Sequence, residues 1–373
     1  MSKQIAVLVE TDDTWGRTVV GELIRLASDR GWRLLIAPRD EQHRLRLPRH
    51  WKGDGVVASI RDSAMRQHLW RLKLPTVDLS AMIPKEDWFA RVITDDRKRA
   101  EMALEYLRCR GFAQFAIYAP RIGRYGPGRG EVFRNLVLRC GYSCETFVNT
   151  KSATGWSIDH QRVRRWLEGL PHPTAVFAAD PYPARQLAEV CSSADIPVPD
   201  QIAILAGDDD DLLCETANPQ LSAVQLDGVQ LARQAVDRLQ FHWRLSRASK
   251  RCLRIPPRQV ITRRSTDYHS VSMPSLQTVL RFIDDHAHTD IRVTDLLKVG
   301  GMSRRNLELL CRRELSASPA ELIRRARMVH ARSRILDGRE SLTQIALNAG
   351  FASSAAFSQQ YKAYFGMCPS VHR

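Results

Sequence analysis

Acidic residues follow two apolar runs of the sequence, where they could bind the hydroxyl groups of a small ligand. Asp180 comes after one run, and Asp208 and Asp209 come after another. In open α/β sheets, ligands bind beyond the carboxyl ends of the strands. A carboxylate there accepts hydrogen bonds from adjacent hydroxyl groups of a sugar. We therefore expect Asp180, with Asp208 or Asp209, to line a sugar-binding cleft, while one residue of the acidic run 208–211 is available as the N-cap of the next helix.

Aromatic and basic residues could complete this cleft. Trp15 and Arg17 come soon after the first apolar run, and Trp15 could stack on the apolar face of a sugar ring or only cover the rim of the cleft. The glycine-rich run 121–130 could cradle a phosphate at a helix N-terminus. It lacks the endings and spacings of known phosphate loops. We therefore favour a cleft loop that donates Arg129 or Arg134 to sugar hydroxyls.

A second group of residues, with polar or short side chains, has the spacing of two exposed helix faces. These residues are Arg304, Arg305, Asn306, Glu308 and Arg312 in the first segment, and Ser354, Ala355, Ser358, Gln359 and Lys362 in the second. Arginine makes two hydrogen bonds to O6 and N7 of guanine, so we expect Arg304 and Arg305 to read bases. Arg312 and Lys362 are better placed to contact DNA phosphates. The short side chains of the second segment would read thymine methyl groups or mainly contact phosphates.

The elements that carry these residues form a repeated pattern. Phe357, Tyr361 and Phe365 are four residues apart and predict one buried helix face, with Ser353 as N-cap. A shorter helix, opened by Thr343, precedes a glycine turn. The same arrangement occurs about fifty residues earlier, where Thr294 and Ser303 are the predicted caps. A short helix, a turn and a second helix make a helix-turn-helix, whose second helix enters the DNA major groove.

One long helix, expected over 319–336, joins the two copies, and we place Leu322 and Val329 on its buried side. This arrangement resembles the AraC-type DNA-binding domain. The run G-F-x-S-S-x-x-F-S-x-x-Y-K-x-x-F-G-x-x-P over 350–369 matches the signature of that family. The resemblance implies an all-α domain with two helix-turn-helix motifs. The alternative is a helical bundle that binds no nucleic acid.

The preceding part of the chain alternates apolar runs with amphipathic segments. This pattern predicts parallel sheets covered by helices on both faces. The expected strands form two sets, the first over 5–94 and the second from 115 onward, which suggests two lobes arranged one after the other with a ligand cleft between them. The segment 254–268 is expected to close the sheet.

The segments 173–180, 196–208 and 219–224 resemble the effector domain of LacI/GalR-type repressors. The resemblance implies a two-lobed, periplasmic-binding-protein-like α/β domain with Rossmann-like lobes. We place this effector domain at 1–268, a linker at 269–275 and the AraC-type domain at 276–373. Because the chain starts directly on a strand, DNA binding is assigned to the C-terminal motifs.

Composition agrees with a nucleic-acid partner. The chain has 56 Lys and Arg against 41 Asp and Glu, and residues 269–373 carry 15 basic and 9 acidic residues. We find no signal peptide and no apolar run that could span a bilayer. Eight cysteines without paired spacing favour reduced thiols in the cytoplasm, where the chain would associate with the nucleoid. No metal or cofactor is expected. Cys140 and Cys144 could share a helix turn and bind zinc, but the sequence offers no second pair of ligands.

Together, the two resemblances imply a sugar-responsive transcription regulator and no enzymatic activity. Its expected partners are a double-stranded DNA operator, a second copy of the chain in a homodimer, and a pentose effector with xylose as the leading candidate. We expect activation of pentose utilisation genes. Two alternatives stay open from the sequence: an α/β enzyme that acts on a sugar or sugar phosphate, and a DNA binder that no longer responds to a ligand.

Overall fold

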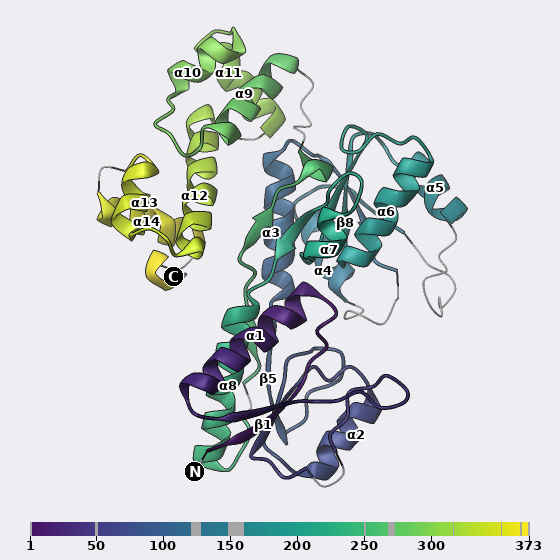
Figure 1. Ribbon diagram of the computed structural model, residues 1–373. Helices are drawn as coiled ribbons and strands as arrows, with labels where there is room; N and C mark the ends of the chain where they lie inside the picture. Colours follow the sequence, from purple (N-terminus) through teal and green to yellow (C-terminus); the bar gives the residue numbers. More distant parts are fainter. Residues whose placement is uncertain are drawn as a thin grey trace.

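The computed structural model describes residues 2–48, 51–120, 128–147, 160–249, 251–267, 273–315, 317–351, 353–365 and 368–371. Figure 1 shows three parts: a lower α/β lobe that contains the N-terminus, an upper α/β lobe, and a helical domain at the C-terminus. Within the described residues, no helix is both long and apolar enough to cross a lipid bilayer.

The first lobe is a six-stranded parallel sheet with the strand order β11-β5-β4-β3-β1-β2. Its elements are β1 (Gln4–Leu8), α1 (Thr14–Asp29), β2 (Arg33–Ile36), β3 (Gly55–Ala58), α2 (Ser63–Leu72), β4 (Thr76–Asp78), β5 (Phe89–Thr94), α8 (Gly228–Leu245) and β11 (Leu253–Ile255). Helices α1 and α8 lie side by side and pack on one face of this sheet (Figure 1).

The second lobe has the strand order β12-β10-β9-β8-β6-β7, in which only β12 is antiparallel to its neighbour. Its elements are α3 (Asp96–Cys109), β6 (Gln114–Tyr118), α4 (Arg129–Arg139), β7 (Cys144–Thr146), α5 (His160–Glu168), β8 (Thr174–Ala178), α6 (Pro181–Ser193), β9 (Ile202–Ala206), α7 (Asp211–Glu215), β10 (Ser222–Gln225) and β12 (Gln259–Ile261), followed by the 3₁₀ helix η1 (Arg264–Thr266). Strands β8 and β9 are buried along their whole length because helices cover both faces.

The expectation of two lobes arranged one after the other is wrong. The chain crosses between the lobes three times, at Asp95, at 226–227 and at 256–258, because α8 and β11 return to the first lobe before β12 joins the second. The segment 254–268 therefore does not close one sheet, since it supplies an edge strand to each. The cleft lies where these crossings occur.

Six helices of the α/β lobes begin after an aspartate. The carboxylates of Asp13, Asp62, Asp95, Asp180, Asp210 and Asp227 each accept a hydrogen bond from a backbone N–H in the first turn of the following helix. Such caps satisfy donors that a helix start leaves unpaired, and each typically contributes about 1 kcal/mol. Within the acidic run 208–211, Asp210 is the residue that caps the next helix.

The C-terminal domain consists of helices around two small cores. These helices are α9 (Pro274–Asp285), α10 (Val293–Gly300), α11 (Arg304–Leu315), α12 (Pro319–Asp337), α13 (Leu342–Asn348) and α14 (Ser354–Phe365), followed by the short helix η2 (Pro369–Val371). Leu296, Leu307 and Cys311 lie in the first core. Ile345 and Tyr361 lie in the second. Helix α12 contributes to both, which confirms the predicted bridging helix.

Three local predictions in this domain are wrong. Thr294 is not the cap of α10, because the helix begins at Val293 and Arg292 is the N-cap. Ser341, and not Thr343, caps α13. Val329 is 51% exposed, whereas Met328 is buried. The last error arises because α12 turns different faces toward the two cores, so one apolar stripe does not describe it. The predicted caps Ser303 and Ser353 are confirmed.

Candidate ligand cleft and DNA-binding surface

A cleft lies between the two lobes beyond the carboxyl ends of their strands. Its charged lining comes from both lobes and from the first crossing, and consists of Asp13, Arg61, Asp96, Arg129, Asp180 and Asp208. Trp15, Ser59, Ser80, Met82 and Thr94 also line it. Carboxylates and guanidinium groups together in a recess match the donors and acceptors of a polyhydroxylated ligand.

The structure brings together four of the predicted ligand residues: Trp15, Arg129, Asp180 and Asp208. The Nη1 atom of Arg129 is 3.9 Å from Asp180 Oδ2 and donates to the carbonyl oxygen of Ala179 at 3.0 Å. Its Nε atom is 3.5 Å from Asp96 Oδ1. Arg129 is therefore held between two carboxylates that also line the cleft.

Asp208 has an unusual protonation state. Burial, helped by the nearby carboxylates Asp180 and Asp13, raises the pKa of its carboxyl from 3.8 to about 8 against the opposing charges of Arg99 and Arg129. A carboxyl with this pKa keeps its proton over much of the neutral range. Asp208 can therefore donate a hydrogen bond to a ligand oxygen as well as accept one.

This shift predicts how replacement of Asp208 by asparagine changes stability with pH. Between pH 4 and pH 8 the folded carboxyl binds its proton more tightly than the unfolded one, so this group lowers stability as the pH rises through that window. Asparagine cannot ionise. The melting temperature of Asp208→Asn relative to wild type, measured without sugar, should therefore increase from pH 5 to pH 8 and then level off. A constant difference would contradict the raised pKa.

Arg99 was not among the residues predicted from the sequence, and it lies next to the cleft on the first turns of α3. Its side chain is 1% exposed and donates from Nη2 to Thr94 Oγ1 at 3.1 Å, with Asp96 Oδ1 at 3.3 Å. The Nε and Nη1 atoms have no hydrogen-bond partner among the described residues. Desolvation, together with the charge of Arg129, lowers its pKa. An arginine on the inward face of a predicted helix, amid Ala100 and Ala103, was the available signal.

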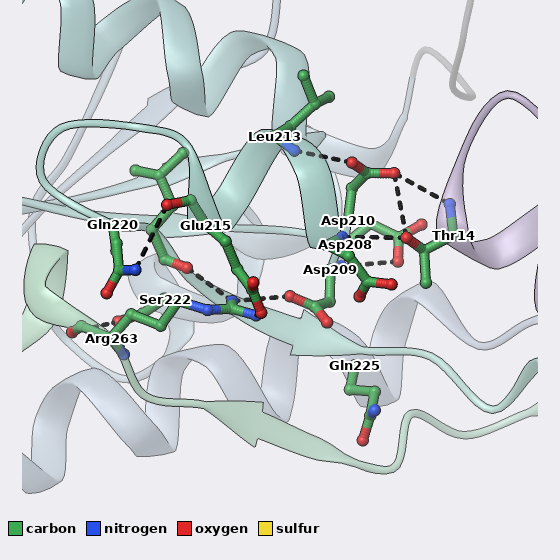
Figure 2. A network of polar contacts seen from close by, with 12 residues as sticks. Thr14, Asp208, Asp209, Asp210, Leu213, Glu215, Gln220, Ser222, Gln225 and Arg263 are labelled. Atoms are coloured by element: carbon green, nitrogen blue, oxygen red, sulfur yellow. Dashed lines mark hydrogen bonds and ion pairs between the residues drawn. The ribbon is translucent and has the colours of Figure 1, made fainter.

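Asp209 is turned away from the cleft. Figure 2 shows its carboxylate on Arg263, whose Nη1 atom is 2.8 Å from Asp209 Oδ1 and also donates to the carbonyl oxygen of Leu221 at 2.9 Å. Glu215 lies 3.8 Å from the other nitrogen of this guanidinium. Asp209 thus ties β9 to the end of β12. Among the described residues, it is not part of the cleft lining.

Asp210 connects the two lobes. Its Oδ2 atom accepts hydrogen bonds from the backbone N–H of Thr14 at 2.9 Å and from the Thr14 hydroxyl at 3.3 Å, while its Oδ1 caps α7 through Leu213 N (Figure 2). The same hydroxyl accepts from the N–H of Asp211 at 3.0 Å. The start of α1 is therefore bonded to the start of α7 across the mouth of the cleft.

Two other predicted ligand residues are outside the cleft lining. Arg17 is exposed and donates to the Thr14 hydroxyl at 2.9 Å. Arg134 is exposed on α4. Most of the glycine-rich run, 121–127, lies outside the described residues, so the choice between a phosphate cradle and a sugar loop stays open there.

A buried ion pair supports one wall of the cleft. Asp78 is fully buried and accepts from Arg91 Nη2 at 2.9 Å and Nε at 3.1 Å. Its other oxygen accepts the N–H groups of Ile60 and Ser80. Arg91 also donates to the carbonyl oxygen of Ile83 at 2.8 Å. The pair therefore holds both ends of the segment 79–83, part of which lines the cleft.

The residues expected to contact DNA are accessible on the two second helices of the helix-turn-helix units. On α11, Arg304, Arg305, Asn306 and Arg312 are exposed and Glu308 is half-buried. On α14, Ala355, Gln359 and Lys362 are exposed, and Ser354 and Ser358 are half-buried. Arg304 Nε lies 3.2 Å from Glu308 Oε1, so Arg305 is the arginine of the two without this intrahelical pairing.

Comparison with known proteins identifies the class. Residues 104–266 match a periplasmic binding protein-like domain, and residues 296–373 match a helix-turn-helix domain. The chain is thus a transcription regulator in which a two-lobed, periplasmic-binding-protein-like domain precedes an AraC-type DNA-binding domain. The resemblance expected from the sequence is confirmed for both halves.

Over its whole length the chain is similar to xylose operon regulatory proteins. It is 29% identical to the one from Escherichia coli (strain K12), with 99% of this chain and 96% of that protein covered. The protein of the same name from Haemophilus influenzae is 25% identical, over 99% and 98% of the two chains. The solved structure of a xylose-binding transcription activator has a TM-score of 0.62 and 26% identity, covering 100% of this chain and 98% of that one. These relatives are regulators and not enzymes.

Proposed function

We propose that the chain is a xylose-responsive transcription activator that acts as a homodimer in the cytoplasm, on nucleoid DNA. The observation that supports this most is the cleft in which Asp180, Asp208 and Arg129 converge from the second lobe on Asp13 and Arg61 of the first. Whole-length similarity to xylose operon regulatory proteins supports the choice of sugar. The boundaries 1–268, 269–275 and 276–373 belong to the same proposal.

In this mechanism the sugar binds between the lobes and shifts the population toward one lobe arrangement. A ligand can shift such an equilibrium only by its difference in affinity for the two states, and groups from both lobes supply that difference. The DNA-binding domains of a dimer then take a new relative position. Asp180, Asp208 and Arg129 would bind sugar hydroxyls, and Trp15 would cover the ring. Asp209, Arg17 and Arg134 are left out of this proposed ligand set, since Asp209 pairs with Arg263 and the two arginines are exposed.

A sugar panel followed by DNA binding tests the proposal. The melting temperature of the full chain is measured with xylose, other pentoses, hexoses and pentose phosphates, and each stabilising compound is added to an operator-binding titration. Xylose should both stabilise the chain and change its affinity for a duplex selected by the full-length protein. Catalytic turnover of a sugar, or an operator affinity that no sugar changes, would contradict the assignment.

The homodimer has a direct expected result. Light scattering at micromolar concentration without DNA should give about twice the 42.4 kDa mass of the chain. Twofold symmetry would present four helix-turn-helix units to two half-sites. A clean monomer, with and without xylose, would remove the symmetrical rearrangement from the mechanism.

The two exposed helix faces should differ in how they recognise DNA. Arg305→Ala should relax base preference at one or two positions, because a two-hydrogen-bond contact to guanine contributes about 1–3 kcal/mol of discrimination. Lys362→Ala should weaken binding to all sequences. It should also reduce the slope of log affinity against log salt concentration by the amount expected for roughly one phosphate contact. Binding-site selection and salt titration with each variant measure both effects. An unchanged sequence preference for Arg305→Ala, with an altered one for Lys362→Ala, would reverse the assignment.

A further inference from the structure

Helix α3 extends from the ligand cleft to the DNA-binding domain. Its first turn carries Asp96, which lines the cleft, and the buried Arg99. Its 14 residues span about 20 Å. Residues in its second half contact the C-terminal domain, and Figure 1 shows α12 beside it. One rigid element thus touches both functional sites.

The last two turns of α3 make polar contacts with helices of the C-terminal domain. The hydroxyl of Tyr364, near the end of α14, donates to Glu105 Oε1 at 2.9 Å. Burial raises the pKa of Tyr364, so the phenol keeps the proton that it donates. On α12, Arg325 Nη1 lies 3.9 Å from the sulfur of Cys109. Arg110 is the C-cap of α3, and its Nη2 atom lies 3.8 Å from Asp284 Oδ2 of α9.

A second contact joins α12 to the third crossing between the lobes. Arg332 is 8% exposed and donates from Nη2 to the carbonyl oxygen of Pro257 at 2.9 Å. The same guanidinium lies over the ring of Phe365 in α14, 4.8 Å from its centroid. Pro257 belongs to the segment 256–258, whose backbone has to adjust when the lobes move relative to each other. The C-terminal domain therefore contacts a segment that joins the two lobes as well as α3.

The DNA-facing side of α14 stays open in this arrangement. Ala355, Gln359 and Lys362 are exposed, whereas Tyr364 and Phe365, which face the α/β part or Arg332, are half-buried. A recognition helix can thus bind the effector domain with one side and DNA with another. Its orientation toward DNA then depends on the position of α3.

We propose that Glu105, Cys109 and the carbonyl of Pro257 form an intramolecular docking surface for α12 and α14, through which closure of the cleft repositions the second helix-turn-helix unit. The inference rests on the proposed function in one respect, since a pentose is taken as the ligand that moves the lobes. The contact between Tyr364 and Glu105 is its most direct test, because neither residue lines the cleft or belongs to the DNA-facing set.

The test compares Glu105→Ala, Tyr364→Phe and the double variant in the full chain. Glu101→Ala is the matched control, since Glu101 is on the same helix and pairs with Arg97 and Lys98 of that helix. Calorimetry measures xylose affinity, and titration of a selected duplex with and without xylose measures the sugar response. We expect unchanged xylose affinity in all variants. The ratio of DNA affinity with xylose to DNA affinity without it should fall at least about fivefold in each single variant. The double variant should show no larger fall than the single variants, because both substitutions remove the same contact. The control Glu101→Ala should keep the wild-type ratio.

Hydrogen exchange without sugar or DNA gives an independent result. Glu105→Ala should increase exchange in the peptide 354–365, although the substitution lies in the other domain, and Glu101→Ala should not. A wild-type sugar response in both single variants overturns the coupling, and unchanged exchange in 354–365 overturns the docking surface. If wild type binds no pentose, the proposed function fails, and the exchange comparison still decides whether α14 docks on α3.

Discussion

Replacing Arg91 by leucine is expected to lower the free energy of unfolding by about 3–5 kcal/mol. Asp78 is fully buried, and Arg91 supplies two of the hydrogen bonds to its carboxylate. Burial already raises the pKa of Asp78 to about 6, against the opposing effects of Ser80, Ile60 and Arg91. Without the guanidinium, the carboxyl either remains charged in an apolar surrounding or takes up a proton. Denaturant unfolding of the two proteins at pH 7 measures the loss.

The pH dependence and a surface control make this prediction specific. The destabilisation by Arg91→Leu should shrink below pH 6, because a protonated Asp78 no longer needs a cationic partner. Arg97→Leu removes an exposed arginine from its pair with Glu101 and should cost less than about 1 kcal/mol. Arg91→Leu with Asp78→Asn should recover part of the loss, since asparagine can still accept from the N–H groups of Ile60 and Ser80. Equal small losses for both arginines would show that the buried pair contributes little.

Asp208→Ala should weaken xylose binding by about 1.5–3 kcal/mol, roughly 10- to 100-fold. The substitution leaves sugar hydroxyls without a partner inside the cleft, beside Arg129 and Asp180. Asparagine has nearly the shape of a protonated carboxyl, so Asp208→Asn should keep more affinity than alanine at pH 6, where Asp208 carries its proton. Isothermal titration calorimetry with xylose compares the three proteins.

Asp211→Ala is the appropriate control for this experiment. Asp211 lies in the same acidic run but is exposed, outside the cleft lining. Its replacement should leave xylose affinity at the wild-type value. Similar losses for Asp208→Ala and Asp211→Ala would indicate that the acidic run acts through its overall charge, and would remove Asp208 from the ligand contacts.

Local sequence patterns were sufficient to predict most elements of the fold. Continuous apolar runs predict buried parallel strands, and Phe357 and Tyr361 at helical spacing predict the core of the second helix-turn-helix. The starts of α10 and α13 were predicted two residues too late, at Thr294 and Thr343 in place of Arg292 and Ser341. Several serine, threonine and charged residues lie near each helix start, and any of them could act as the cap. Patterns of this kind carry information over only a few residues.

The cleft was harder to predict because its composition depends on contacts between distant residues. Asp208 and Asp209 are adjacent, but Asp209 pairs with Arg263 and Asp208 faces the cleft. Thr14 and Asp210 meet across the lobes although 196 residues separate them. In the sequence, Arg99 resembles other helical arginines, and its burial follows from the position of α3 directly after the crossing at Asp95. The environment of each charge, and therefore its role, follows from the three crossings.

The crossings also determine the order in which the protein can be completed during synthesis. The first sheet lacks its edge strand until residue 255 has been made, and the second sheet lacks its edge strand until residue 261. Neither lobe can reach its final structure while the ribosome is still adding the other, so both mature almost together. The C-terminal helices emerge last and have short-range contacts of their own. A chain that stops before residue 253 would therefore lack an edge strand in both sheets, whereas one that stops after 267 would lose the C-terminal helices and retain every strand around the cleft.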